Sequence, residues 1–307
     1  MIRYISILLS TLLLLAGCGN KQEQEKSIQI DILRGPSVIA LAHWLKNPPV
    51  INGIKANVRV IDSPQMVQAG LIKNESDIAV LPTVSAANLY NKGVGLRIAG
   101  CPIWGTLYLV ECDASDDSEL YIFGQGTTPD ILTRYYIAKT GLDYTTNNSF
   151  QTAREVAQGI MAGKIKRAVL GEPFISMTLK RVKSLRITAD LNQLASDEGG
   201  GFAQTAIVYS SRVEQFKDEI DSAIKEACDI ANREPEKTIK ILEEHNIFAK
   251  GALNEESIMR CKIDYQPASK AADDVINLLK LIMEYEPKAI GGKLPDATFM
   301  GIHQGEE

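Results

Sequence analysis

The sequence predicts an α/β protein built as two lobes. From Ser27 onward, short apolar segments alternate with amphipathic segments, the pattern of strands and helices that alternate along a chain. The same order of elements occurs twice, and a largely helical stretch follows. Of the 307 residues, 45% are hydrophobic and 23% are charged, which is the balance of a soluble globular protein.

The first cycle of elements begins at residue 28. Its expected strands are residues 28–33, 58–61, 78–81 and 96–99. The helices between them are residues 38–45, 64–73 and a segment opened by Pro82-Thr83 that runs to residue 90. Trp104 and an extended stretch at residues 106–111 then lead into the second cycle.

The second cycle repeats the first at an offset of 89 residues. Gly35 matches Gly124, and the strand at residues 79–81 matches that at 168–170. Nine identities over about seventy positions indicate a shared order of elements and do not establish a duplication. A polar loop at residues 190–202 and a strand at 204–209 follow.

The chain after residue 209 is expected to be almost wholly helical. Apolar residues recur at helical spacing in residues 211–232, 234–245 and 270–285, with Ser210 or Ser211 as the N-cap of the first helix. We expect these helices to complete the first lobe. The chain then crosses between lobes twice, near residues 106–111 and 204–209.

Four loops follow predicted strands and lead into helices: residues 34–37, 81–85, 123–129 and 171–173. Ligands of open α/β sheets bind at such strand ends, and helix N-termini offer free N–H donors to anions. The loops therefore predict a cleft for an anionic or zwitterionic ligand. The glycine-rich loop is no phosphate loop, because it lacks the lysine, and Pro129 stands where a dinucleotide fingerprint needs glycine.

Several side chains near these loops allow two interpretations. Thr128 reads as an N-cap followed by Pro129 at the first helical position, and plain capping competes with ligand contact. Glu172 either meets an amine or stabilises a helix N-terminus. Trp104 either stacks on a ligand or lines the hinge, and Arg34 either meets an anion or is structural. Trp44 is expected in the core.

Composition excludes several function classes. The net charge of −5 argues against nucleic-acid binding, which needs a basic face. His43, His245 and His303 have no metal-ligand spacing. The sequence holds no Gly-x-Ser-x-Gly motif, and no cysteine has a plausible histidine partner. We therefore expect no metal, no cofactor and no catalytic residue.

The first residues read as an export signal. Arg3 precedes an apolar run at residues 5–15, which is too short to span a bilayer. Leu15-Ala16-Gly17-Cys18 resembles a bacterial lipobox, so we expect a signal peptide over residues 1–17, a lipid on Cys18 and a polar tether over 18–27. An ordinary secretory signal is the alternative. The cysteines at 101, 112, 228 and 261 form either disulfides or buried free thiols, and we favour thiols.

Three stretches together resemble the lipid-anchored substrate-binding proteins of ABC importers, in the nitrate, sulfonate and thiamine-precursor branch. They are Leu33-Arg34-Gly35-Pro36-Ser37, the run Asp77-Ile78-Ala79-Val80-Leu81-Pro82-Thr83, and Gly124 to Asp130 followed by Gly171-Glu172-Pro173-Phe174. The resemblance covers residue 27 to at least residue 286. It implies a type II periplasmic binding protein fold, with two α/β lobes joined by two crossover strands.

The resemblance also implies the site and the partners. By position, the ligand contacts are Arg34, Gly35, Ser37, Thr83, Trp104, Thr106, Gln125, Thr127, Thr128 and Glu172. Lobe 1 comprises residues 28–107 and 207–307, and lobe 2 comprises 108–206. The expected partners are a small-molecule ligand, an ABC permease with its ATPase, and the membrane, which the protein contacts through the lipid on Cys18. We expect the protein to be exported and monomeric.

Two alternative functions are compatible with a similar fold or with the same export signal. An exported enzyme on the same fold is one alternative. However, the sequence lacks the cysteine-rich run of the pyrimidine-synthase relatives, which argues against that chemistry. The related chorismate-processing lyase is cytoplasmic, so a lipobox argues against that enzyme as well. A lipoprotein that senses or scaffolds is the other. The sequence does not choose among sulfonate, nitrate and thiamine-precursor ligands.

Overall fold

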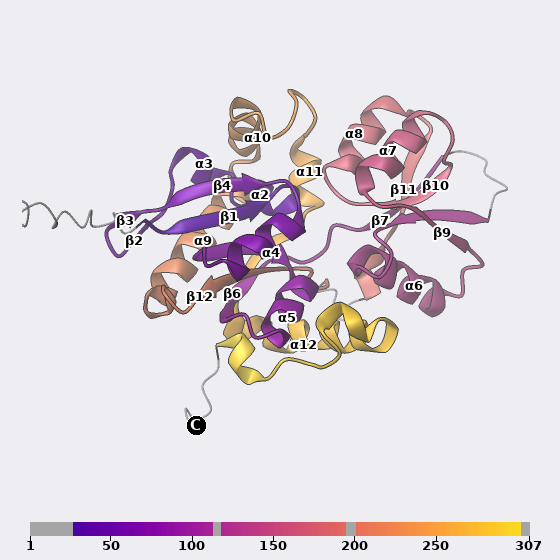
Figure 1. Cartoon of the computed structure of the whole chain (residues 1–307). Coiled ribbons are helices and arrows are strands. Elements are labelled where there is room, and N and C mark those ends of the chain that lie inside the picture. The colour runs from indigo at the N-terminus through magenta and orange to yellow at the C-terminus, as the bar shows by residue number, and fades with distance from the viewer. Residues whose placement is uncertain (1–26, 113–117, 195–200, 302–307) are drawn as a thin grey trace, which may run out of the picture.

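The computed structural model describes residues 27–112, 118–194 and 201–301, and its elements form two α/β lobes (Figure 1). The expected signal peptide, Cys18 and nearly all of the tether lie outside the described residues. No helix within the described ranges is long and apolar enough to cross a bilayer.

The larger lobe is organised around a six-stranded sheet in the order β13-β6-β12-β5-β1-β4. Strand β1 pairs in parallel with β4 and β5, whereas β12 runs antiparallel to β5 and β6, and β13 antiparallel to β6. The strands are β1 (Gln29–Leu33), β4 (Asn57–Ile61), β5 (Ile78–Pro82), β6 (Leu96–Ile103), β12 (Thr205–Ser210) and β13 (Ile263–Pro267).

Alternation along these strands divides the core between the two faces of the larger sheet. Ile30 and Val80 belong to the cluster that packs against α2 (Pro36–Ala40), α3 (His43–Lys46), α9 (Lys217–Arg233) and α10 (Pro235–Glu244). Ala79 and Leu81 belong to a second cluster, packed against α5 (Thr83–Asn91) and α12 (Ala268–Tyr285). This is the period of two that a strand buried on both faces requires. Helix α4 (Pro64–Ile72) also contacts β1 and β5.

The smaller lobe holds a five-stranded sheet in the order β11-β7-β10-β8-β9. Its strands are β7 (Tyr108–Cys112), β8 (Glu119–Phe123), β9 (Thr145–Phe150), β10 (Arg167–Leu170) and β11 (Leu185–Asp190). Its helices are α6 (Thr128–Thr140), α7 (Ala153–Met161) and α8 (Phe174–Arg181). Figure 1 shows this lobe beside the larger one, with the chain passing from β6 to β7 between them. The residue-level lobe boundaries given above stay a prediction.

Three expectations about local structure were wrong. The expected helix over residues 38–45 is two short helices, α2 and α3, because hydrogen bonds shift to three-residue spacing around Leu41, from Ala42 N to Ile39 O and from Trp44 N to Leu41 O. Neither Ser210 nor Ser211 caps a helix, because the 3₁₀ turn η2 (Glu214–Phe216) precedes α9.

The third wrong expectation concerns the C-terminal part. It is not almost wholly helical, because β13 adds an edge strand to the larger sheet beside β6. Ile263 and Tyr265 of β13 are buried in the core. The hairpin formed by β2 (Val50–Ile51) and β3 (Ile54–Lys55) was also not expected. The short helix α11 (Glu255–Met259) lies just before β13.

The cysteines within the described residues are free thiols. Cys101, Cys112, Cys228 and Cys261 are all buried and unbridged. This agrees with the favoured one of the two alternatives, and it fits a chain whose large core needs no covalent reinforcement.

Candidate functional site

The sheets bring the predicted loops together in two pairs. Strands β1 and β5 run in parallel in the larger sheet, so the loop at residues 34–37 and the start of α5 lie at the same edge. Strands β8 and β10 run in parallel in the smaller sheet, so the loop before α6 and the loop before α8 also share an edge. These are the carboxyl ends of strands, where α/β sheets bind their ligands.

Thr83 joins the larger sheet to the returning chain. Its side chain is fully buried, and its hydroxyl donates to the carbonyl of Ala203 at 2.5 Å. Its amide donates to the carbonyl of Gln204 at 3.0 Å. Thr83 therefore fixes the first turn of α5 against the segment that leads into β12.

Trp104 and Thr106 lie on the segment that crosses from β6 to β7. The indole N–H of Trp104 donates to the carbonyl of Asp264 at 2.6 Å, and the ring is buried. This favours the hinge interpretation of Trp104 over an open stacking surface. Thr106 is also buried, and it reaches the smaller lobe. A Cβ atom on Gly171 would lie 3.0 Å from the carbonyl oxygen of Thr106, so glycine permits this close approach.

Asn192, which the sequence analysis did not single out, organises the same crossing. Its amide donates to the carbonyl of Leu107 at 3.1 Å, and its oxygen accepts from the Gln204 side chain at 2.8 Å. Gly105 has φ +148°, and a Cβ there would lie 2.2 Å from the Asn192 side chain. The sequence around Asn192 does not indicate this role, because Asn192 lies in a polar loop and its partners Leu107 and Gln204 are distant in the chain.

The loop before α6 is stabilised from within. The amide of Gly126 donates to Asp130 Oδ2 at 2.8 Å, and the hydroxyl of Thr127 donates to the carbonyl of Gly124. The N-cap is Thr127, with extended backbone (φ −107°, ψ 175°), and Thr128 is the first helical residue. The expected cap was therefore one residue too late. Gln125 is exposed and Thr128 is buried.

Glu172 has partners in the protein itself. Its carboxylate lies 2.5 Å from Nε of Arg260 and 2.9 Å from the Ser176 hydroxyl, and it accepts from the amide of Ser176 at 3.3 Å. Burial raises the pKa of Glu172, while Arg260 and Ser176 act in the opposite direction. The bond to the amide of Ser176 fits a carboxylate that stabilises a helix N-terminus. Contact with a ligand stays a prediction.

Arg34, Gly35 and Ser37 lie at the end of β1. The Arg34 guanidinium pairs with Asp62 at 2.5 Å and donates to the carbonyl of Ile247 at 2.6 Å, with 30% of its side chain exposed. Gly35 has φ +131°, which favours glycine, and Ser37 is buried. The contacts to Asp62 and Ile247 hold the side chain of Arg34 in place.

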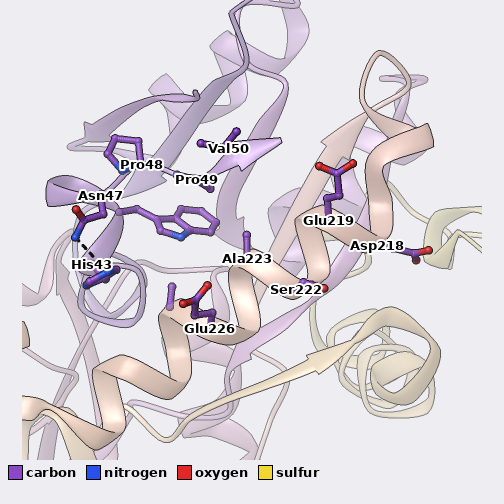
Figure 2. A pocket seen from close by; sticks show the side chains of 12 residues that line it. His43, Asn47, Pro48, Pro49, Val50, Asp218, Glu219, Ser222, Ala223 and Glu226 are labelled. Atoms are coloured by element: carbon purple, nitrogen blue, oxygen red, sulfur yellow. Dashed lines mark hydrogen bonds between the residues drawn. The ribbon is translucent and has the colours of Figure 1, made fainter. Parts of the chain in front are cut away.

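Two cavities lie elsewhere. One of about 580 Å³ opens on the larger lobe between α3, β2 and α9, where His43, Pro48 and Val50 face Asp218 and Glu226 (Figure 2). One of about 210 Å³ lies between Tyr135 of α6 and Asp274 and Leu281 of α12. None of the ten predicted contacts lines either cavity. Thr83, Trp104, Thr106, Thr128 and Glu172 are buried in this conformation.

The described residues show no metal cluster. Within residues 27–112, 118–194 and 201–301, no group of three or more His, Cys, Asp or Glu side chains is placed to hold an ion. The candidate site offers hydrogen-bond donors at the starts of helices. The crossing segments that position these helices have their own polar groups paired. Such a site can recognise a polar solute.

Comparison with solved structures identifies the family. A crystal structure of an ABC transporter protein from Parabacteroides distasonis is 56% identical, covers 91% of this chain and 99% of its own, and superposes with a TM-score of 0.88. The chain belongs to the family of this ABC transporter protein. No protein-family model matches the sequence, and no curated protein matches it.

More distant relatives support the fold of this ABC transporter protein. The periplasmic aliphatic sulphonate binding protein SsuA from Escherichia coli is 14% identical, with a TM-score of 0.69 over 89% of this chain and 91% of its own. The alkanesulfonate-binding SsuA from Xanthomonas axonopodis, bound to MOPS, is 18% identical, with a TM-score of 0.62 over 88% and 94%. At such identities the likeness shows the fold alone, which is the expected type II periplasmic binding protein fold.

Proposed function

We propose that this chain is a substrate-binding protein, which captures a small anionic or zwitterionic solute between its lobes and delivers it to an ABC permease and its ATPase. A sulfonate, nitrate or thiamine-precursor-like compound fits the proposal. The protein works as an exported monomer, held to the cell membrane by a lipid on Cys18, and it returns the solute unchanged.

One observation carries the proposal: in each lobe, the sheet edge at the carboxyl ends of the parallel strands contacts a segment that crosses between the lobes. In the larger lobe, Thr83 bonds to Ala203 and Gln204 of the returning chain. In the smaller lobe, Gly171 lies against Thr106 of the outgoing chain. A solute held at both edges touches both lobes, and a solute can favour the closed state only through such differential contact.

Helix starts supply the chemistry of recognition. The amide of Thr83 is taken by Gln204, but the next N–H groups of α5 and the first N–H groups of α6 have no partner within their helices. They carry the positive end of the helix dipole. They suit a sulfonate, carboxylate or nitrate group. The start of α8 differs, because the amides of Phe174 and Ile175 already donate to the carbonyl of Gly171 and that of Ser176 donates to Glu172. We therefore place the anionic group at α5 and α6, with Arg34 nearby.

A ligand panel tests the proposal. Thermal unfolding and native mass spectrometry are run with ethanesulfonate, MOPS, nitrate and a hydroxymethylpyrimidine. A solute that binds only the folded protein raises its stability by RT ln(1 + [L]/Kd), about 2.7 kcal/mol at 100 times Kd. We expect one of these classes to bind one molecule per chain. Absence of binding by all four, or conversion of the bound compound to product, would contradict the proposal.

A further inference from the structure

Five residues form a hydrogen-bonded network that spans the two lobes. We call it the Arg260 network: Tyr108 of β7, Glu172 and Ser176 from the start of α8, and Ser257 and Arg260 from the α11 region. We propose that Arg260 is a positioning residue that fastens the smaller lobe to the larger one and thereby sets the open–closed balance. The inference rests on the proposed function, since it names what controls affinity at that site.

The guanidinium of Arg260 makes most of the connections. Its Nε lies 2.5 Å from Glu172 Oε1, and its Nη2 donates to the Ser176 hydroxyl at 2.8 Å. The Arg260 carbonyl accepts from the Tyr108 hydroxyl at 2.9 Å. The Glu172 side chain is 0% exposed and that of Arg260 is 16% exposed. One arginine therefore binds two elements of the smaller lobe, through its side chain and its backbone.

A pair of serine hydroxyls reinforces the contact. The hydroxyl oxygens of Ser176 and Ser257 are 2.6 Å apart and buried. Ser257 is held in place by the capping box of α11, in which Asn254 Oδ1 accepts from the Ser257 amide at 3.0 Å and the Ser257 hydroxyl oxygen accepts from the Asn254 amide at 2.9 Å. The capping box thus fixes the hydroxyl that meets α8.

The α11 region is anchored in the larger lobe. Helix α11 contacts α9 and α10, and the chain continues into β13 of the larger sheet. The Trp104 amide donates to the carbonyl of Lys262 at 3.2 Å, and the Asn232 side chain donates to that of Ile263 at 2.7 Å. Figure 1 shows α11 between the larger lobe and α8. Separation of α8 from α11 therefore separates the lobes.

Two more contacts lie at the margin of this interface. Lys180 Nζ donates to the carbonyl of Gly251 at 2.8 Å, and Lys262 Nζ lies 2.6 Å from Asp190 Oδ2. Both lysines are partly exposed, so solvent screens these contacts and each contributes little. The buried Glu172–Arg260 pair is different, because removal of one partner leaves the other charge without its counterion. The network therefore holds the conformation in which Thr83, Trp104, Thr106, Thr128 and Glu172 are buried.

Small-angle X-ray scattering without added solute tests the proposal. We expect Arg260→Met to increase the radius of gyration, because the lobes separate, and Arg260→Lys, which keeps the charge, to give an intermediate value. The matched control is Arg59→Met: Arg59 pairs at 2.8 Å with the buried Asp31 inside the larger lobe. This control should lower the melting temperature and leave the radius unchanged.

Affinity for ethanesulfonate gives a second measurement. We expect Arg260→Met to weaken binding roughly tenfold, because less of the protein is in the closed state, and Arg59→Met to leave it unchanged. Identical scattering for cooperatively melting Arg260→Met and wild type would overturn the proposal. So would lost affinity with unchanged scattering, which would make Arg260 a solute contact.

A second variant keeps the test decisive if Arg260→Met does not fold. Glu172→Gln keeps the shape and removes the charge, and it should open the lobes in the same direction. An unchanged radius for this variant would equally overturn the proposal. A wild-type protein that does not bind ethanesulfonate contradicts the sulfonate form of the proposed function, whereas the scattering comparison, made without solute, decides the role of Arg260.

Discussion

The hydroxyl of Thr83 donates to the carbonyl of Ala203 across 120 residues of sequence, at 2.5 Å and fully buried. This bond ties the start of α5 to the chain returning from the smaller lobe. We predict that Thr83→Val, which keeps the shape but loses the donor, lowers the free energy of unfolding by about 1–2 kcal/mol, because the carbonyl loses its partner. Urea unfolding measures the change.

The control for that prediction is Thr83→Ser, which keeps the hydroxyl. It should recover most of the lost stability. If the valine variant is as stable as the wild type and the serine variant is destabilised, packing of the γ-methyl group matters at this position and the hydrogen bond does not.

The loop before α6 gives a prediction about affinity. We expect Thr127→Ala combined with Thr128→Ala to weaken solute binding more than it lowers stability, because both residues begin a helix directed at the proposed cleft. A cap loss costs typically about 1 kcal/mol. Calorimetric titration with the solute found in the panel, together with urea unfolding, separates the two effects.

A matched capping variant lies in the same lobe. Thr152 caps α7 in a capping box with Glu155, and none of the predicted contacts lies on that helix. Thr152→Ala should therefore cost about 1 kcal/mol of stability and leave affinity unchanged. If the Thr127 and Thr128 changes behave like Thr152→Ala, those threonines serve only as caps.

The buried thiols predict how the protein responds to alkaline pH. Burial raises the pKa of Cys101, Cys228 and Cys261 above that of an exposed thiol. In the unfolded chain these thiols ionise near pH ~8.5. Their contribution to stability is thus complete below that pH and is lost as pH rises through the higher folded-state values.

An aromatic disulfide reagent tests the same residues. At pH 8 the reagent should modify the three thiols slowly in the native protein. It should modify them at once after the protein is unfolded in urea. Rapid modification of all three in the native protein would show that this part of the core opens. Melting temperatures recorded between pH 8 and 10 should fall with pH.

The lipid anchor is the subject of a fourth prediction. Cys18→Ser should move the protein from the membrane fraction to the soluble fraction, because two acyl chains are lost. Replacement of Cys228, a buried thiol in α9, with Ala is the control and should leave the fractionation unchanged. Equal membrane association of the Cys18→Ser variant would favour an ordinary secretory signal.

Local patterns predicted the elements that carry the proposed site. The apolar runs of β1 and β5, and the Gly and Pro residues after them, carry information within about ten residues of sequence. They were sufficient to predict the alternating fold and the loops at the strand ends. The one-residue error at Thr128 has a local cause: the hydroxyl of Thr127 turns back to Gly124, which no spacing rule reveals.

Contacts between distant segments were not predictable in this way. Glu172 and Arg260 are 88 residues apart, and nothing near Arg260 in the sequence points to a buried carboxylate. The sequence around β13 does alternate, with Ile263 and Tyr265 buried and Asp264 exposed. At five residues between helices, however, such a strand is too short to identify by periodicity alone.

A crystal structure of the protein with the solute from the panel tests the central claim most directly. We predict that the solute lies between the lobes, with its anionic group within hydrogen-bond distance of first-turn amides of α5 and α6. Density for the solute in the outer cavity between His43 and Glu226 (Figure 2), with the interlobe loops empty, would contradict the proposed function.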